Sequence, residues 1–231
     1  MLPVLSSEAS GRRRTTAGRA IARGVSRHPL RFKRLRLDVR GGGRAPVREG
    51  EETARHFVRV WAEAVIRQAR RTRETRQVSA DNSRAYDRAE DFSPGPEQLE
   101  LDFRTQWAEE HLLVWCAHQL ERWRGRLARE RGETPPPEDQ DLKLARDALE
   151  HLDEASFADD EARSPADKGP AGRALRGLPG QRLRLSLGGG SLFEVLDPER
   201  LDQKALEVVK SVEQELADRA VAAYEDLVGG R

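Results

Sequence analysis

The chain has 231 residues, 35% charged and 37% hydrophobic, which suffices for one core with tails but is polar enough to predict some unfolded sequence. Its net charge of +1 conceals a basic arm and an acidic body, because residues 1–50 hold 13 Lys and Arg against 3 Asp and Glu, while the remainder holds 28 against 37. A single cysteine, Cys116, excludes an internal disulfide and a cysteine cluster for zinc, and no apolar run approaches the roughly 18 residues of a membrane span.

Residues 1–48 form the basic arm, which lacks a sustained hydrophobic period and is expected to be largely disordered, apart from a short strand over 31–39. Three interpretations are open: an electrostatic hold on nucleic acid, a solvated tail, or upstream sequence included by a wrong start codon. The arm superficially resembles a transit peptide. Arginine outnumbers lysine along the whole chain, however, and a GC-rich bacterial genome explains this bias more simply. The single cysteine fits a reducing location, so we expect a cytoplasmic protein.

Residues 49–231 are predicted to be mainly α-helical, with helices over about 51–78, 97–131, 138–155 and 197–227. Each helix is predicted from a set of positions at helical spacing. In chain order the four sets are Phe57, Trp61, Ala64, Val65 and Gln68, with Val58 and Ile66 widening the face; Leu99, Phe103, Trp107, Leu113, Val114, Ala117 and Leu120; Leu142, Ala145, Ala148, Leu149 and Leu152; and Leu201, Ala205, Val208, Val209, Val212, Leu216, Ala220, Tyr224 and Leu227.

The stretch RLRLSLGGGSLFEVL, residues 182–196, changes from helical spacing to alternation. Two alternating runs separated by three glycines predict a β-hairpin, and the Gly- and Pro-rich residues 156–180 before it are expected to be a loop. Four helices without βαβ alternation favour a four-helix bundle, with the hairpin inserted before the last helix.

Several chemistries lack their motifs in this sequence. There is no phosphate-binding GxxxxGK[ST] loop, no dinucleotide-binding GxGxxG, no GxSxG elbow and no Glu-x-x-His of a di-iron bundle, so we expect no cofactor. His111 and His118 share one helical face, but Trp107 and Trp115 beside them favour a structural role over a metal site.

The run ARDALEHLDE, residues 145–154, places Arg146 and His151 on one predicted helix with Asp147 directly after the arginine. Arg146 and His151 each lie roughly 110° from the apolar stripe, on opposite sides, so neither is a core residue. Asp147 precedes the histidine by four residues and Glu154 follows it by three, so either carboxylate could orient the imidazole.

A four-helix order with Arg-x4–6-His on a late helix, and a polar residue after the arginine, resembles the HEPN superfamily of helical, metal-independent RNases. The resemblance covers about 51–227 in architecture and RDALEHLDE in motif. It implies that Arg146 binds the RNA phosphate, that His151 acts as general base or acid, and that Asp147 orients one of them. It further implies a homodimer with facing motifs, and a toxin or phage-defence role with an antitoxin or other partner protein.

Other interpretations stay open. Arg146 with Glu150, and Asp147 with His151, are also the i,i+4 pairs of an ordinary exposed helix surface. An acidic body with a net charge of −9 repels RNA, which favours a non-catalytic helical protein that binds a protein partner or a nucleotide, or a nucleic-acid binder that works through its arm alone. Arg104 and His111 form a second candidate pair with the same kind of spacing.

Overall fold

The computed structural model describes residues 49–166, 169–170, 172–186 and 190–229. The chain divides into two units, Met1–Gly41 and Gly42–Arg231, and every described residue belongs to the second. The basic arm predicted over residues 1–48, with its strand, therefore lies outside the described residues.

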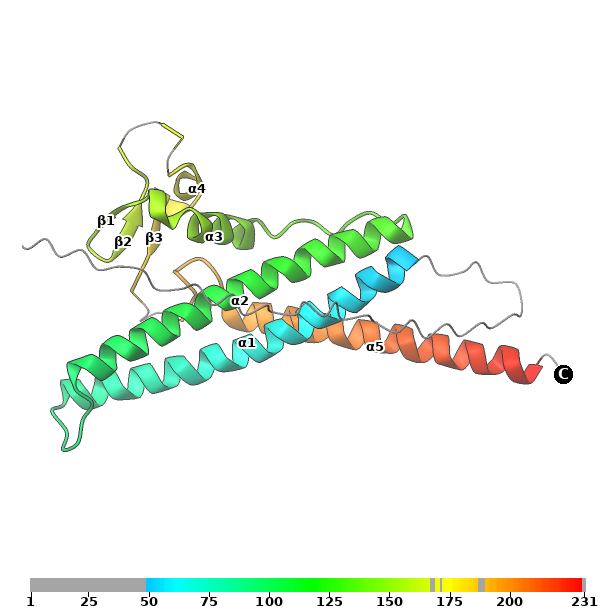
Figure 1. The fold of residues 1–231 in the computed structure, drawn as a ribbon, viewed down its shortest axis with the longest axis horizontal. Helices are drawn as coiled ribbons and strands as arrows, with labels where there is room; N and C mark the ends of the chain where they lie inside the picture. The colour runs from blue at the N-terminus through cyan, green and yellow to red at the C-terminus, as the bar shows by residue number, and fades with distance from the viewer. Residues whose placement is uncertain (1–48, 167–168, 171, 187–189, 230–231) are drawn as a thin grey trace, which may run out of the picture. The chain divides into compact units, whose positions relative to one another are not determined.

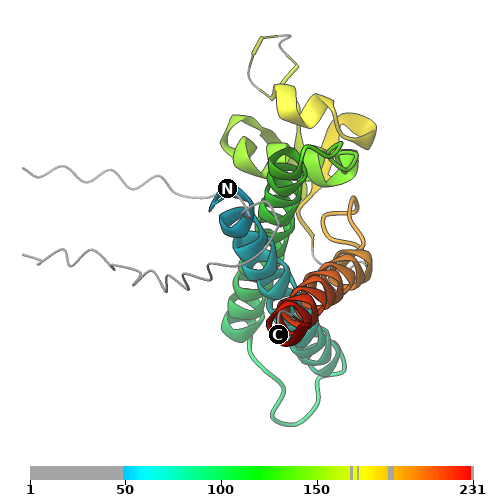
Figure 2. The same cartoon turned by 90° about the vertical axis from the view of Figure 1, so that its right-hand side faces the viewer.

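The described chain is mostly helical, with 73% of its residues in helices and a small three-stranded antiparallel sheet between them. Three helices are long: α1 (Glu49–Asp87), α2 (Pro96–Arg131) and α5 (Pro198–Gly229). Helix α1 packs against both of the others, as Figures 1 and 2 show from two directions. The mainly α class is confirmed. A four-helix bundle is not, because the remaining longer helix, α3 (Gln140–Glu150), has only 11 residues and packs on α2.

The ends of α2 and α3 follow from local chemistry. Helix α2 begins at Pro96, whose missing N–H costs nothing in a first turn, and it ends at Arg131 because Gly132 adopts the left-handed conformation, as the sequence predicts. Helix α3 starts where the Asp139 side chain accepts a hydrogen bond from the Leu142 N–H at 3.2 Å. It ends at Glu150, earlier than expected, because His151 leaves the helix and a 3₁₀ turn follows over Leu152–Glu154.

Helix α1 extends nine residues beyond its expected end at residue 78. The added stretch is polar and carries no apolar period, but Asn82 donates a hydrogen bond of 2.7 Å to Asp102 on α2, and Gln77 bonds Asp81 one turn away at 2.9 Å. Tertiary contact with α2 thus stabilises helix where periodicity stops.

The sheet comprises β1 (Ser156–Ala158), β2 (Glu161–Arg163) and β3 (Arg182–Arg184) in that order. The predicted hairpin over 182–196 is therefore wrong in its pairing: β3 pairs with β2, and Leu192 and Leu196 form only an isolated bridge with each other. The predicted loop 156–180 instead contains two strands and the short helix α4 (Arg173–Arg176). Burial of Ala162 opposite Leu183, both fully inaccessible, favours the observed pairing.

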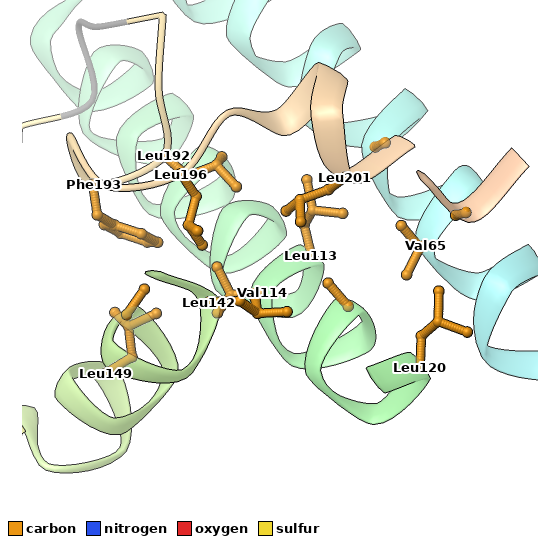
Figure 3. Packing of buried hydrophobic residues seen from close by; sticks show 14 of the residues in the cluster. Val65, Leu113, Val114, Leu120, Leu142, Leu149, Leu192, Phe193, Leu196 and Leu201 are labelled. Carbon is orange, nitrogen blue, oxygen red and sulfur yellow. The ribbon is translucent and has the colours of Figure 1, made fainter. Parts of the chain in front are cut away.

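One hydrophobic core joins these elements (Figure 3). Val65 from α1, Leu113 from α2, Leu142 from α3 and Leu201 from α5 meet in it, and all are at most 4% exposed. The turn after the sheet adds Phe193, whose ring packs edge-on against Trp107 with a centroid distance of 4.9 Å. The core therefore fixes α3 and the residues after it, which carry the predicted site, against α2.

Candidate functional site

Helix α3 presents Arg146 beside two carboxylates. The Arg146 Nη2 lies 2.7 Å from Asp147 Oδ1, and Nη1 forms an ion pair with Glu150 one turn later. The side chain is only 23% exposed, and its buried Nε has no hydrogen-bond partner in the described part of the chain. Arg146 is thus a partly desolvated cation, the kind of group that binds an anion strongly, but two carboxylates neutralise it in this state.

His151 terminates α3 and contacts Glu154. Its Nδ1 lies 3.2 Å from Glu154 Oε1, and the other carboxylate oxygen of Glu154 accepts a hydrogen bond from the Gly172 N–H at 2.8 Å. The hydrogen bond from Gly172, followed by that of His151, lowers the pKa of Glu154, so the carboxylate stays ionised.

This arrangement resembles a histidine–carboxylate dyad in its chemistry. With a hydrogen on Nδ1, the His151 ring donates to Glu154 and leaves Nε2 as an acceptor, which is the tautomer that a general base needs. The ring is 54% exposed, so a substrate can reach it. Of the two carboxylates that the sequence offered, Glu154 is the one that contacts the imidazole, while the carboxylate of Asp147 contacts Arg146.

Arg146 and His151 are not brought together as a pair in the single chain. Within residues 49–166, each has its own carboxylate partners, and no hydrogen bond or ion pair joins the two side chains. The link between the predicted site residues runs through the backbone, where the Asp147 carbonyl accepts the His151 N–H at 3.2 Å. A phosphate would have to be shared between separated groups, as the helical spacing of the two residues already implies.

Two histidines of α2, His111 and His118, belong to the same neighbourhood, although the sequence favoured a structural role for them. Burial lowers the pKa of both, and the charges of Arg146 and Arg122 lower that of His118 further. The negative charge of Glu150 opposes this effect at each ring, so a charged side chain of α3 acts on both histidines. Their seven-residue spacing was visible in the sequence, but the packing of α3 over it was not.

The second candidate pair, Arg104 and His111, gains no support. Arg104 is 64% exposed and lies 3.8 Å from Glu100 on its own helix, whereas His111 is half-buried toward α3. The described part of the chain holds no cluster of three or more His, Cys, Asp or Glu that could bind a metal ion. None of the helices described here is long and apolar enough to cross a membrane.

Comparison of the chain with protein-family models, with curated proteins and with solved structures found no match.

Proposed function

We propose that this protein is a metal-independent endoribonuclease of the HEPN type. The observation that carries the proposal is the dyad in which Glu154, itself fixed by the Gly172 N–H, contacts Nδ1 of an exposed His151. An imidazole whose Nδ1 is held by a carboxylate leaves its Nε2 free to accept a proton from a substrate.

In the proposed reaction, His151 removes the proton of an RNA 2′-hydroxyl. The resulting oxygen attacks the adjacent phosphorus, a P–O2′ bond forms, and the P–O5′ bond breaks to give a 2′,3′-cyclic phosphate. Arg146 binds the nonbridging oxygens and stabilises the charge that develops on them. The leaving 5′-oxygen takes a proton from a second donor, which in a homodimer with facing motifs would be His151 of the other copy.

Arg146 must exchange partners for this reaction. Its present ligands are the carboxylates of Asp147 and Glu150, so an incoming phosphate would displace at least one of them. Both carboxylates are about one-third exposed, and they can swing into solvent at little cost. In this proposal Asp147 positions the side chain of Arg146 until RNA binds.

Cleavage of a single-stranded RNA in excess EDTA tests the proposal, using wild type, His151→Ala and Arg146→Ala. Matched controls are His56→Ala, an exposed histidine on α1, and Arg126→Ala, which forms the same i,i+4 pair with Glu130 on α2. We expect both site variants to lose cleavage about 100-fold or more, and both controls to retain it. Cleavage that survives both site substitutions would refute this assignment of the active site.

A second candidate function is that of a non-catalytic helical protein that binds a partner protein, such as an antitoxin. One observation favours it: the C-terminal half of α5 exposes Leu216, Val221, Tyr224, Leu227 and Val228, each at least 41% accessible. Under this alternative, Tyr224→Glu with Leu227→Glu would abolish the association while His151→Ala leaves it intact. If the protein is the proposed endoribonuclease, His151→Ala should lose RNA cleavage, while the variant with Tyr224→Glu and Leu227→Glu should retain it.

A further inference from the structure

A cleft of about 310 Å³ lies between α2, α3 and the connection that joins them, away from the dyad of His151. One face of α2 lines it with His118, Arg122, Gly125 and Arg129, and Lys143 of α3 faces them. The volume is at the lower end of ligand-sized clefts, roughly 300–1,000 Å³. Unlike the surroundings of Arg146, this cleft contains arginines that no carboxylate of the described residues neutralises.

The two arginines of the cleft are available for a ligand. Within the described residues, neither Arg122 nor Arg129 forms an ion pair or a side-chain hydrogen bond, in a chain where most described arginines do both. They lie seven residues apart on α2, so both project from the same face of the helix. The space over Gly125 between them is open apart from the Arg129 Nη1, which an added Cβ would meet at the ordinary contact distance of 3.5 Å.

The acidic residues of the cleft are already occupied by other cations. Asp139 pairs with Arg200 at 2.6 Å, and Glu121 pairs with Lys204 at 2.9 Å, so both charges are balanced from α5. Glu138 is paired with Lys143 at 2.8 Å. The remaining charge of the cleft is therefore positive, and it comes from Arg122 and Arg129.

His118 supplies an unsatisfied polar atom at the same place. Its Nδ1 is buried and has no hydrogen-bond partner among the residues that the structure describes, although a buried polar atom normally has one. The charges that act on the ring are Arg122 on its own helix, Arg146, Asp147 and Glu150 on α3, and Glu138 on the connection. A bound anion would oppose the effect of Arg122 and Arg146 on this ring, and it would raise the pKa of His118.

From the two unpaired arginines, the open glycine and the unsatisfied histidine, we propose that this cleft binds a phosphate group of the RNA backbone. Arginine pairs with phosphate through parallel hydrogen bonds that lysine cannot reproduce. Because arginine binds a carboxylate in the same geometry, the inorganic phosphate in the test below separates a phosphate site from a site for a carboxylate-bearing peptide. The naming of RNA rests on the proposed function, whereas the phosphate chemistry rests on the cleft alone. The cleft would hold the strand on α2 while the reacting group lies at the end of α3.

The test separates binding from cleavage by using a fully 2′-O-methylated oligonucleotide, which has no 2′-hydroxyl to react. Full-length wild type, Arg122→Gln/Arg129→Gln and Arg126→Gln are titrated with it at low salt, and inorganic phosphate is a second probe. Arg126 is the matched control, because it lies on the same helix but is paired with Glu130 outside the cleft. We expect the double variant to bind the oligonucleotide at least tenfold more weakly, and the control to bind as wild type does.

The His118 ring signals give a measurement that needs no variant. Phosphate or oligonucleotide bound in the cleft is expected to shift them and to raise the pKa of His118, with no such change at His56. Equal affinity of the double variant and wild type, or His118 signals that do not move at saturation, would overturn the inference. Cleft binding without any cleavage would refute the endoribonuclease alone, and His151-dependent cleavage with unaltered binding by the double variant would refute the cleft alone.

Discussion

His151 Nδ1 lies 3.2 Å from Glu154 Oε1, and this contact links the end of α3 to the 3₁₀ turn that follows it. The Gly172 N–H binds the other oxygen of the same carboxylate, so a residue 18 positions further along the chain fixes the orientation of the pair. A histidine on a plain helix surface needs neither contact. These contacts suit the proton transfer that we propose for His151.

Replacing Glu154 by glutamine tests whether the carboxylate positions the imidazole. The amide would keep the size of the side chain but lose the charge that favours hydrogen on Nδ1, so we expect cleavage to fall about tenfold or more. Ring ¹⁵N chemical shifts of His151 measure the tautomer directly, and they should show less hydrogen on Nδ1 in Glu154→Gln. An unchanged tautomer with reduced cleavage would assign Glu154 a merely structural role.

A buried ion pair between α1 and α2 is expected to be costly to break. Arg76 Nε donates to Glu110 Oε1 at 2.8 Å, and its other nitrogens donate to the carbonyls of Gly190 and Ser191. Glu110 is 1% exposed, so Arg76→Ala leaves its charge buried without a cation. We expect a loss of about 3–5 kcal/mol in the free energy of unfolding.

Chemical denaturation measures this loss, with Arg70→Ala as the control. Arg70 pairs with Glu74 on the exposed surface of α1, and its removal should cost about 0.5 kcal/mol or less. Similar losses in the two variants would show that the buried pair contributes no more to the free energy of unfolding than the exposed pair does.

The histidines of α2 make stability depend on pH. The pKa values of His111 and His118 are lowered from 6.5, chiefly by burial, so below that pH the unfolded chain binds more protons than the folded one. These two histidines should therefore not reduce the free energy of unfolding above pH 6.5. The free energy should fall as the pH drops toward about 5.5, where exposed carboxylates are still ionised. His118→Gln should flatten this dependence, measured by denaturant unfolding at each pH; a slope identical to wild type would contradict it.

The basic arm gives a prediction of its own. Residues 1–50 carry a net charge of +10, so removal of residues 1–41, the first of the two units, should weaken RNA binding and reduce its dependence on salt. We expect the rate of cleavage at saturating RNA to be unchanged, because the site residues lie in the second unit. Unaltered affinity at low salt would indicate a solvated tail.

The sequence predicted those features whose causes are local. Pro96 and Gly132 define α2 by their own backbone preferences, and the carboxylate that contacts His151 was one of two that helical spacing allowed. The sheet was missed because three-residue strands carry too little alternation, and because Leu183 pairs with Ala162 across 20 intervening residues. The cleft was missed because its residues are far apart in the sequence, and only the packing of α3 on α2 brings Lys143 and Arg146 to His118.

Cleavage of a single-stranded RNA by His151→Ala in EDTA, beside His56→Ala, tests the central claim most directly. We expect His151→Ala to lose activity about 100-fold or more and His56→Ala to match wild type, with products that end in 2′,3′-cyclic phosphates. Equal cleavage by wild type and both variants, or no cleavage by wild type over a range of RNA sequences, would contradict the claim that the His151–Glu154 pair at the end of α3 is catalytic.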